Sequence, residues 1–365
     1  MERFEISFPD AALADLRERL ERTRWPETPT AGSWDEGTSV PAMRGLAHAW
    51  QADDWRAHEA ALNAYEHYRV ELDAQPVHWL HVRRPGELPL LMLHGWPSTH
   101  WDFARLLPHL DGLELVVPDL PGYGFSPLAR TGIGYLETAE LMHSLMTEVL
   151  GHARYAVYGF DWGALVAEQL AHAHEGAVVA LHTSMPFPLD FAPPAQELWA
   201  ADEQPFAERT AQWAQEGFAY FQLQATRPQT LAYLTDSPAA LGAWILEKVN
   251  AWTDHDGDLA SAYPRDQLLA NLSLYWLTGT FGTAARFYAE SLRRPWRAAH
   301  DGTPVIRVPT GIAAFPKENS QVPRSFCEQY FDLRRYTRMP KGGHFAPVEQ
   351  PEALAAELTA FLASL

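Results

Sequence analysis

An eight-residue run, Tyr-Gly-Phe-Asp-Trp-Gly-Ala-Leu at positions 158–165, restricts the fold of this chain more than any other feature. The apolar stretch ARYAVYGF leads into it, and the helix-forming stretch GALVAEQLAHAH follows. Glycines stand two residues before and two residues after Asp161, a spacing typical of a sharp strand-to-helix turn that exposes one side chain. Proteins that cut esters usually carry serine in such a turn, and a carboxylate there predicts attack on an electrophilic carbon. A helix cap is the alternative role for Asp161.

Short apolar runs alternate with helical stretches from residue 88 onward. The runs of strand length include LPLLMLHG, LELVVPDL, ARYAVYGFD and AVVALHTS, and a helical stretch, YLETAELMHSLMTEVLG, separates two of them. Buried strands that alternate with helices indicate a parallel sheet covered by helices on both faces. We therefore expect an α/β fold with a mostly parallel central sheet.

Changes in this pattern divide the chain into four segments. Residues 1–85 carry helical patterns and turn-rich stretches and are expected to form an N-terminal extension. Residues 86–185 hold the first part of the sheet. In residues 186–300 the strand pattern stops, and helical, aromatic-rich stretches such as AALGAWILEKVNAW predict an inserted cap. Strand patterns resume in residues 301–365, which complete the core and end in a helix.

Charge and apolar content argue against several classes of partner. A formal net charge of -18, from 28 basic and 46 acidic residues, argues against nucleic acid and against an anionic membrane surface. The N-terminus MERFEISFPD has no secretory signal, and no apolar run reaches about 18 residues, so we expect a cytoplasmic protein without a membrane anchor. The only cysteine is Cys327, so no disulfide can form within the chain.

The sequence His-Gly-Trp-Pro at 94–97 follows directly on the predicted strand PLLML. A glycine-containing loop after this early strand commonly provides one backbone N–H of an oxyanion hole, and here the donor would be Trp96. The residue after the nucleophile would provide the second donor, which is Trp162. The alternative is a tight turn without a catalytic role.

A histidine and an acid stand in the order that such catalysis requires. Gly-Gly-His-Phe at 342–345 lies between the last predicted strand and the final helix, where an α/β-hydrolase carries its base, so His344 would activate water. The acid that orients this base should follow a late strand, and Glu318 follows VPTGIAAF. Asp301 precedes that strand and Asp332 lies in the next one, so both fit the role less well.

HGWP, GFDWG and GGHFA, in this order, resemble an epoxide hydrolase of the α/β-hydrolase superfamily, of the microsomal and juvenile-hormone type with its own N-terminal domain. The resemblance covers nearly the whole chain. It extends to FEISFPDAALADLRERLERTRWPE near the start, to QATRPQTLAYLTDSPAALGAWILEKVNAWTD in the cap and to VPTGIAAFPKE near the end. Microsomal members begin with a membrane anchor, whereas this chain starts directly in the N-terminal domain and so is similar to a soluble bacterial member.

The resemblance implies a role for five side chains. Asp161 would be the nucleophile, Glu318 the charge-relay acid and His344 the base. Two cap tyrosines would donate hydrogen bonds to the epoxide oxygen: Tyr220, just ahead of the QATRP run, and Tyr288, in RFYAE. We also expect four residues of the motifs to contact the substrate, namely Trp96, Pro97, Phe160 and Trp162.

These roles predict that the partners are an apolar small-molecule epoxide and water. A vicinal diol would form through a covalent alkyl-aspartate ester. No metal or organic cofactor is expected, because neither zinc-ligand spacing nor a P-loop is present. The aromatic run Phe-Ala-Tyr-Phe at 218–221 predicts a tight, apolar pocket wall.

Two alternatives to this function remain open. A haloalkane or haloacid dehalogenase uses the same aspartate nucleophile and would need halide-binding donors, for which Trp96 and Trp162 are candidates. A ligand-binding or scaffolding member of the fold would carry out no reaction. The physiological epoxide, its pathway (detoxification, carbon use or natural-product tailoring) and the oligomeric state, a homo-oligomer included, do not follow from the sequence.

Overall fold

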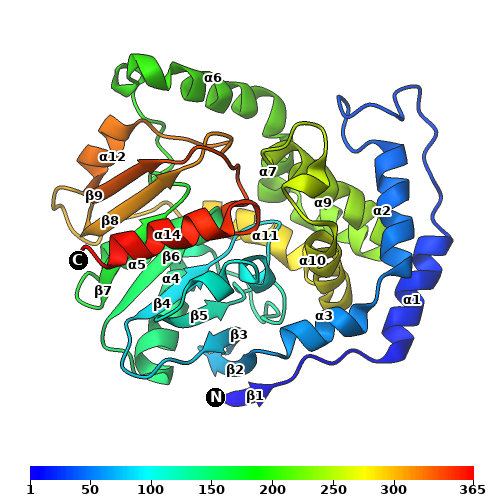
Figure 1. Cartoon of the computed structure of the whole chain (residues 1–365), viewed down its shortest axis with the longest axis horizontal. Coiled ribbons are helices and arrows are strands. Elements are labelled where there is room, and N and C mark those ends of the chain that lie inside the picture. The colour runs from blue at the N-terminus through cyan, green and yellow to red at the C-terminus, as the bar shows by residue number, and fades with distance from the viewer.

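A nine-stranded sheet forms the centre of the computed structural model, which describes residues 1–365 (Figure 1). The strand order is β1-β2-β3-β5-β4-β6-β7-β8-β9. All pairs from β5 to β9 are parallel, whereas β1, β2 and β3 join the sheet antiparallel. The mostly parallel sheet predicted from the sequence is therefore confirmed. The strands are β1 (Glu2–Phe4), β2 (Glu66–Leu72), β3 (Gln75–Val82), β4 (Pro89–Leu93), β5 (Glu114–Pro118), β6 (Tyr155–Gly159), β7 (Val178–Thr183), β8 (Ile306–Ala314) and β9 (Phe331–Arg338).

Helices cover both faces of this sheet and extend beyond one end of it (Figure 1). The helices from α6 to α11 all follow β7 and precede β8, in the segment expected to form the cap. The helices are α1 (Asp10–Glu21), α2 (Val40–Ala52), α3 (Trp55–Leu62), α4 (Tyr135–Ser144), α5 (Trp162–Ala173), α6 (Gln204–Gln212), α7 (Ala219–Thr226), α8 (Pro228–Leu231), α9 (Pro238–Trp252), α10 (Arg265–Thr278), α11 (Phe281–Leu292), α12 (Arg324–Tyr330), α13 (Ala346–Glu349) and α14 (Pro351–Leu362). No helix combines the length and the apolar character needed to cross a membrane.

The central strands are apolar on both faces because successive side chains of a strand point to opposite sides. In β4, Leu91 belongs to the core cluster that contains Leu165 of α5, whereas Leu90 belongs to a second cluster that contains Leu358 of α14. A strand that buries both faces has no polar positions to alternate with, which explains why these strands appear in the sequence as continuous apolar runs.

The N-terminal helices pack against the helices that follow β7. Trp50 of α2 donates its indole N–H to the hydroxyl of Ser273 in α10 (2.7 Å), and both side chains are buried. A Cβ atom at Gly242 of α9 would lie 2.8 Å from Met43 Cε, so α2 and α9 approach this closely because residue 242 lacks a side chain. The N-terminal segment is thus attached to α9 and α10.

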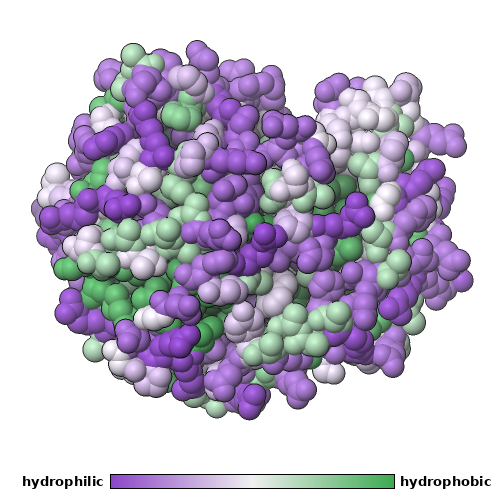
Figure 2. All heavy atoms as spheres, viewed as in Figure 1, coloured by the Kyte–Doolittle hydropathy of each residue, from purple (hydrophilic) through white to green (hydrophobic).

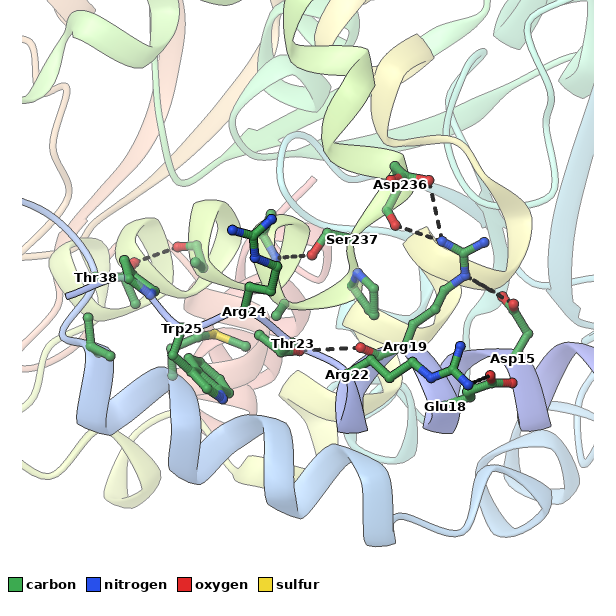
Figure 3. Close-up of a pocket in the computed structure, with 17 residues that line it drawn as sticks. Asp15, Glu18, Arg19, Arg22, Thr23, Arg24, Trp25, Thr38, Asp236 and Ser237 are labelled. Carbon is green, nitrogen blue, oxygen red and sulfur yellow. Dashed lines mark hydrogen bonds and ion pairs between the residues drawn. The ribbon is translucent and has the colours of Figure 1, made fainter.

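A hollow of about 690 Å³ lies beside this contact, between α1 and the start of α9 (Figure 3). Arg19 pairs with Asp15 (2.9 Å) and with Asp236 (3.3 Å), and Arg22 pairs with Glu18 (2.7 Å). The hollow contains none of the predicted catalytic residues. Figure 2 shows the same face of the molecule as Figure 1, on which hydrophilic residues are interspersed with smaller hydrophobic patches.

Candidate active site

Asp161 stands in a strained turn between β6 and α5. Its backbone has φ 53° and ψ -131°, a conformation that residues other than glycine rarely adopt. A Cβ atom at Gly159 would lie 2.1 Å from the Gly163 carbonyl oxygen, and one at Gly163 would lie 2.1 Å from the Leu93 carbonyl oxygen, so neither position tolerates a side chain. The Asp161 side chain makes no capping hydrogen bond to α5, although the residue occupies the N-cap position. Its carboxylate is therefore free for another role.

The loop that follows β4 provides a hydrogen-bond donor for this carboxylate. The backbone N–H of Trp96 donates to Asp161 Oδ1 (2.6 Å). The loop comes this close because residue 95 is glycine: a Cβ there would lie 2.0 Å from the same oxygen. Trp162 is the first residue of α5, so its N–H has no acceptor within the helix. One predicted oxyanion donor, the Trp96 N–H, thus contacts the carboxylate, and the other, the Trp162 N–H, follows Asp161 directly in the chain.

His344 lies between Glu318 and Asp161. Its Nδ1 is 2.9 Å from Glu318 Oε1, and its Nε2 is 3.5 Å from Asp161 Oδ2. An ionised carboxylate can only accept a hydrogen bond, so Nδ1 carries a proton and donates the hydrogen bond to Glu318. Burial alone would lower the pKa of His344, but the negative charges of Glu318 and Asp161 outweigh it and raise that pKa to about 10.

Of the three candidate acids, Glu318 alone contacts the histidine. Glu318 follows β8 and is almost fully buried, and its Oε1 also accepts the backbone N–H of Asn319 (2.7 Å). Asp301 is exposed, and Asp332 pairs with Arg334 (2.9 Å) in β9. The hydrogen bond from Asn319 holds the Glu318 carboxylate in place beside His344.

Tyr220 of α7 and Tyr288 of α11 face the same cavity as Asp161. Both side chains are buried, and their ring centroids are 6.0 Å apart. Burial raises the pKa of each hydroxyl well above its ordinary value. The Tyr288 hydroxyl has no hydrogen-bond partner in the protein, so it is available to a group in the cavity.

The cavity above Asp161 is small, about 90 Å³, and mostly apolar. Its wall comes from the turn at Asp161, from the loop after β7, from the helices of the expected cap and from the loops after β8 and β9. The lining residues are Asp161, Trp162, Leu165, Met185, Phe187, Phe191, Trp213, Phe218, Tyr220, Phe221, Trp252, Tyr288, Glu318, Asn319, Ser320 and His344.

Three of the four predicted substrate contacts do not line this cavity. Trp96 is fully buried and stacks beneath the ring of Tyr220 (5.3 Å between centroids). Phe160 points to the other side of the sheet, where it packs against Phe103 (5.7 Å). Pro97 is also buried in its loop. The backbone of these turns sets the direction of each side chain, and among the four only Trp162 reaches the cavity.

A clamp around His344 was missed from the sequence. Glu349, in the short helix α13, is buried, and burial raises its pKa to about 7 although it accepts three backbone N–H groups. Every backbone N–H from residue 342 to 345 has an acceptor in this clamp or at the end of α9. The bonds run from Gly342 to Asp254 Oδ2 (2.9 Å), from Gly343 to Glu349 Oε2 (2.9 Å), from His344 to the Trp252 carbonyl (3.0 Å) and from Phe345 to Glu349 Oε1 (2.9 Å). Only its position within GGHFAPVE marks Glu349 in the sequence.

The fold also assembles a group of metal-ligand type that sequence spacing did not reveal. Ring nitrogens of His78 and His100 and a carboxylate oxygen of Asp119 lie within 4.8 Å of one another, all buried. Each ring Nδ1 contacts the carboxylate, at 2.9 and 2.8 Å, and the Phe125 N–H donates to it at 2.8 Å. These bonds satisfy the Asp119 carboxylate from within the protein, and the group lies outside the cavity wall.

Comparisons with known proteins identify the family of this chain. The family model described as "Epoxide hydrolase N terminus" matches residues 1–103, and the model described as "alpha/beta hydrolase fold" matches residues 89–351. A relative from Stigmatella aurantiaca is 37% identical over 97% of this chain and 83% of its own length. Epoxide hydrolase 1 of Oryctolagus cuniculus is 31% identical over 98% of this chain and 88% of its own length. The solved structure of Aspergillus niger epoxide hydrolase superposes with a TM-score of 0.87 at 30% identity, over 100% of this chain and 96% of that one.

Proposed function

This chain belongs to the epoxide hydrolase family of the α/β-hydrolase fold, and we propose that it opens its epoxide through a covalent ester on Asp161. It is an enzyme that hydrolyses an epoxide to a vicinal diol. The observation that carries the covalent route is the Asp161 carboxylate itself. One of its oxygens accepts the Trp96 N–H at 2.6 Å, and the other faces His344 Nε2 at 3.5 Å, at the floor of an apolar cavity.

Ring opening is the first step of the proposed reaction. A carboxylate oxygen of Asp161 attacks one ring carbon from the side opposite the ring oxygen, so that an ester C–O bond forms as the ring C–O bond breaks. The hydroxyls of Tyr220 and Tyr288 bind the ring oxygen, and one of them transfers its proton to it. Their burial suits this step, because an alkoxide without a donor would be costly in an apolar cavity.

Hydrolysis of the ester is the second step. Esterification removes the charge of Asp161, which lowers the pKa of His344. The imidazolium then gives its proton to the tyrosine phenolate left by the first step and becomes a neutral base. His344 Nε2 then accepts a proton from water while the water oxygen attacks the ester carbonyl. The backbone N–H groups of Trp96 and Trp162 bind the resulting oxyanion. Its collapse releases the diol and restores the Asp161 carboxylate with one oxygen from water.

A labelling experiment tests the covalent route. In a single turnover in ¹⁸O-water, with enzyme in excess over epoxide, we expect the label in Asp161 and an unlabelled diol. Peptide mass spectrometry locates the label in the protein. Label in the first diol would mean that water attacks the epoxide directly, and the covalent route would then be abandoned.

A dehalogenase is the less favoured alternative. Halide binding would need two donors at the cavity, and the indole of Trp96 is buried behind Tyr220 rather than in the wall. The tyrosine pair instead suits an oxygen that stays attached to the substrate.

The size of the cavity favours a compact apolar epoxide. About 90 Å³ lies well below the several hundred Å³ of common ligand pockets, and the side chains of Trp213, Phe218 and Phe221 contribute to the wall. A panel of terminal, cis, trans and bulky aromatic epoxides would define this preference. A cytoplasmic location and a homo-oligomeric state are further proposals, which cell fractionation and light scattering would test.

A further inference from the structure

A buried ammonium group lies over the ring of Tyr220. Lys248 of α9 has 8% of its surface exposed, and its Nζ is 5.0 Å from the centroid of the Tyr220 ring. The same Nζ is 5.4 Å from the ring centroid of Trp244, one turn earlier on the helix. Its ion-pair partner is Glu247, a half-buried neighbour in the chain. A lysine held between two aromatic rings inside the protein suggests a role beyond a surface charge.

We propose that Lys248 sets the acidity of Tyr220 and thereby makes Tyr220 the tyrosine that gives its proton to the epoxide oxygen. This inference rests on the proposed function, because it requires a tyrosine acid in the ring-opening step. As the O–H bond breaks, negative charge spreads from the phenolic oxygen into the ring. A cation over the ring stabilises that charge more strongly in a buried site than in water.

The other charges near Tyr220 act in the opposite direction. Burial raises the pKa of Tyr220 most, the carboxylates of Asp161, Glu318 and Glu247 raise it further, and the nearby Tyr288 hydroxyl lowers it in part. A hydroxyl in such surroundings would be a poor acid. Lys248 places a positive charge 5.0 Å from the centre of the ring, where it acts against the carboxylates.

The two tyrosines of the cavity are therefore not equivalent. Tyr288 has aromatic neighbours instead of a cation: its ring meets Trp162 edge-on at 4.8 Å and Phe221 at 5.2 Å. Tyr288 would hold the ring oxygen by a hydrogen bond and keep its proton. Tyr220 would transfer its proton and become a phenolate.

The two steps together return every proton that the enzyme gives up. Ring opening converts Asp161 and the epoxide into an ester and leaves a negative charge on Tyr220. The imidazolium of His344 gives its proton to the Tyr220 phenolate and becomes the base. In the second step one proton of the water goes to the diol oxygen released from the ester, and the other stays on His344. The enzyme then has its starting charges, with a carboxylate at Asp161, an imidazolium at His344 and a phenol at Tyr220.

Single-turnover kinetics of matched variants test the inference. Rapid quenching and intact-protein mass spectrometry give separate rates for ester formation and ester hydrolysis. Lys248→Met keeps the length and apolar body of the side chain without the charge. We expect it to slow ester formation about 10-fold, equal to about 1.4 kcal/mol, and to leave ester hydrolysis within about two-fold. Lys248→Arg keeps a cation and should retain most of the rate.

The neighbouring residue provides a control of opposite sign. Glu247→Gln removes a negative charge next to the same ring, so ester formation should stay equal or become faster. Damage to α9 in general would slow both variants and both steps. If Lys248→Met fails to fold, as judged by circular dichroism, the comparison of Lys248→Gln with Lys248→Arg replaces it.

Three results would overturn the assignment of Lys248. The first is ester formation by Lys248→Met at the wild-type rate. The second is an equal loss of rate in ester formation and ester hydrolysis in Lys248→Met. The third is a loss in the rate of ester formation in Glu247→Gln as large as in Lys248→Met. If the wild-type enzyme forms no ester at all, the proposed function fails instead, and the two failures are thereby distinguished.

Discussion

Replacement of Asp161 by Asn tests how the active site changes His344 from an acid to a base. Asn has nearly the shape of Asp and, like the ester, carries no charge. His344 Nε2 lies 3.5 Å from Asp161 Oδ2 in a buried site. At an effective dielectric constant of about 20, two unit charges at this separation interact by about 4 to 5 kcal/mol, or about three pKa units. Since the pKa of His344 is about 10 with Asp161 charged, we expect about 7 in Asp161→Asn.

Titration by nuclear magnetic resonance of ¹⁵N-labelled histidines measures this change, and a His344→Gln spectrum identifies the signal. Asp332→Asn serves as a control, because its carboxylate pairs with Arg334 in β9 and does not contact His344. A His344 pKa that stays within one unit of the wild-type value in Asp161→Asn would refute the reasoning. It would mean that Glu318 alone holds the imidazolium and that ester formation does not release the base.

The same shift has a consequence for stability. A histidine whose pKa is raised on folding contributes stability that is complete below its unfolded pKa, about 6.5, and is lost as pH rises through its folded pKa, about 10. The free energy of unfolding of the wild type should therefore decline between these pH values. In Asp161→Asn the decline in the free energy of unfolding should end at about pH 7, as measured by urea denaturation across the pH range.

Three further predictions concern the base, its clamp and the pocket wall. His344→Gln should let the ester accumulate, with hydrolysis slowed about 10²- to 10⁴-fold, and an adduct that is never trapped by mass spectrometry would contradict its role as base. Glu349→Gln replaces one carboxylate oxygen that accepts backbone N–H groups with an NH₂ group, which cannot accept them. The free energy of unfolding in urea should fall by about 1 to 3 kcal/mol, and ester hydrolysis should slow more than ester formation. Equal effects on both steps would argue for a purely structural role. Phe221→Ala should raise kcat/KM for bulky aromatic epoxides by about 10-fold relative to small ones, and an unchanged ratio would show that this ring does not limit the pocket.

Sequence alone was sufficient for the features that depend on local geometry. The glycines around Asp161 identified the strand-to-helix turn. A Cβ atom at either glycine would lie 2.1 Å from a backbone oxygen, so any fold with this turn needs glycine at both positions. The strands of the sheet could be recognised because burial on both faces forces a continuous apolar run. The order of the three motifs then sufficed for the family.

Tertiary structure was needed wherever a property depends on residues that are distant in the chain. Glu318, Asp301 and Asp332 are all carboxylates near late strands, and only the packing of β8 against β9 brings Glu318 to His344. The fold alone also decided that Trp96, Pro97 and Phe160 lie behind the cavity wall, because the direction of a side chain is set by its backbone and its neighbours rather than by its distance from a motif.

The charges around the two tyrosines illustrate the same limit. Lys248 belongs to a helical stretch whose apolar residues predict a buried face. Nothing in the sequence relates Lys248 to Tyr220, 28 positions earlier. The ammonium reaches that ring because α9 packs beside α7, and the clamp of Glu349 reaches Asp254 because the end of α9 meets the loop of His344. Local sequence thus determined which chemical groups this enzyme carries. The packing of helices onto the sheet decided which of them meet, and hence how acidic each one is.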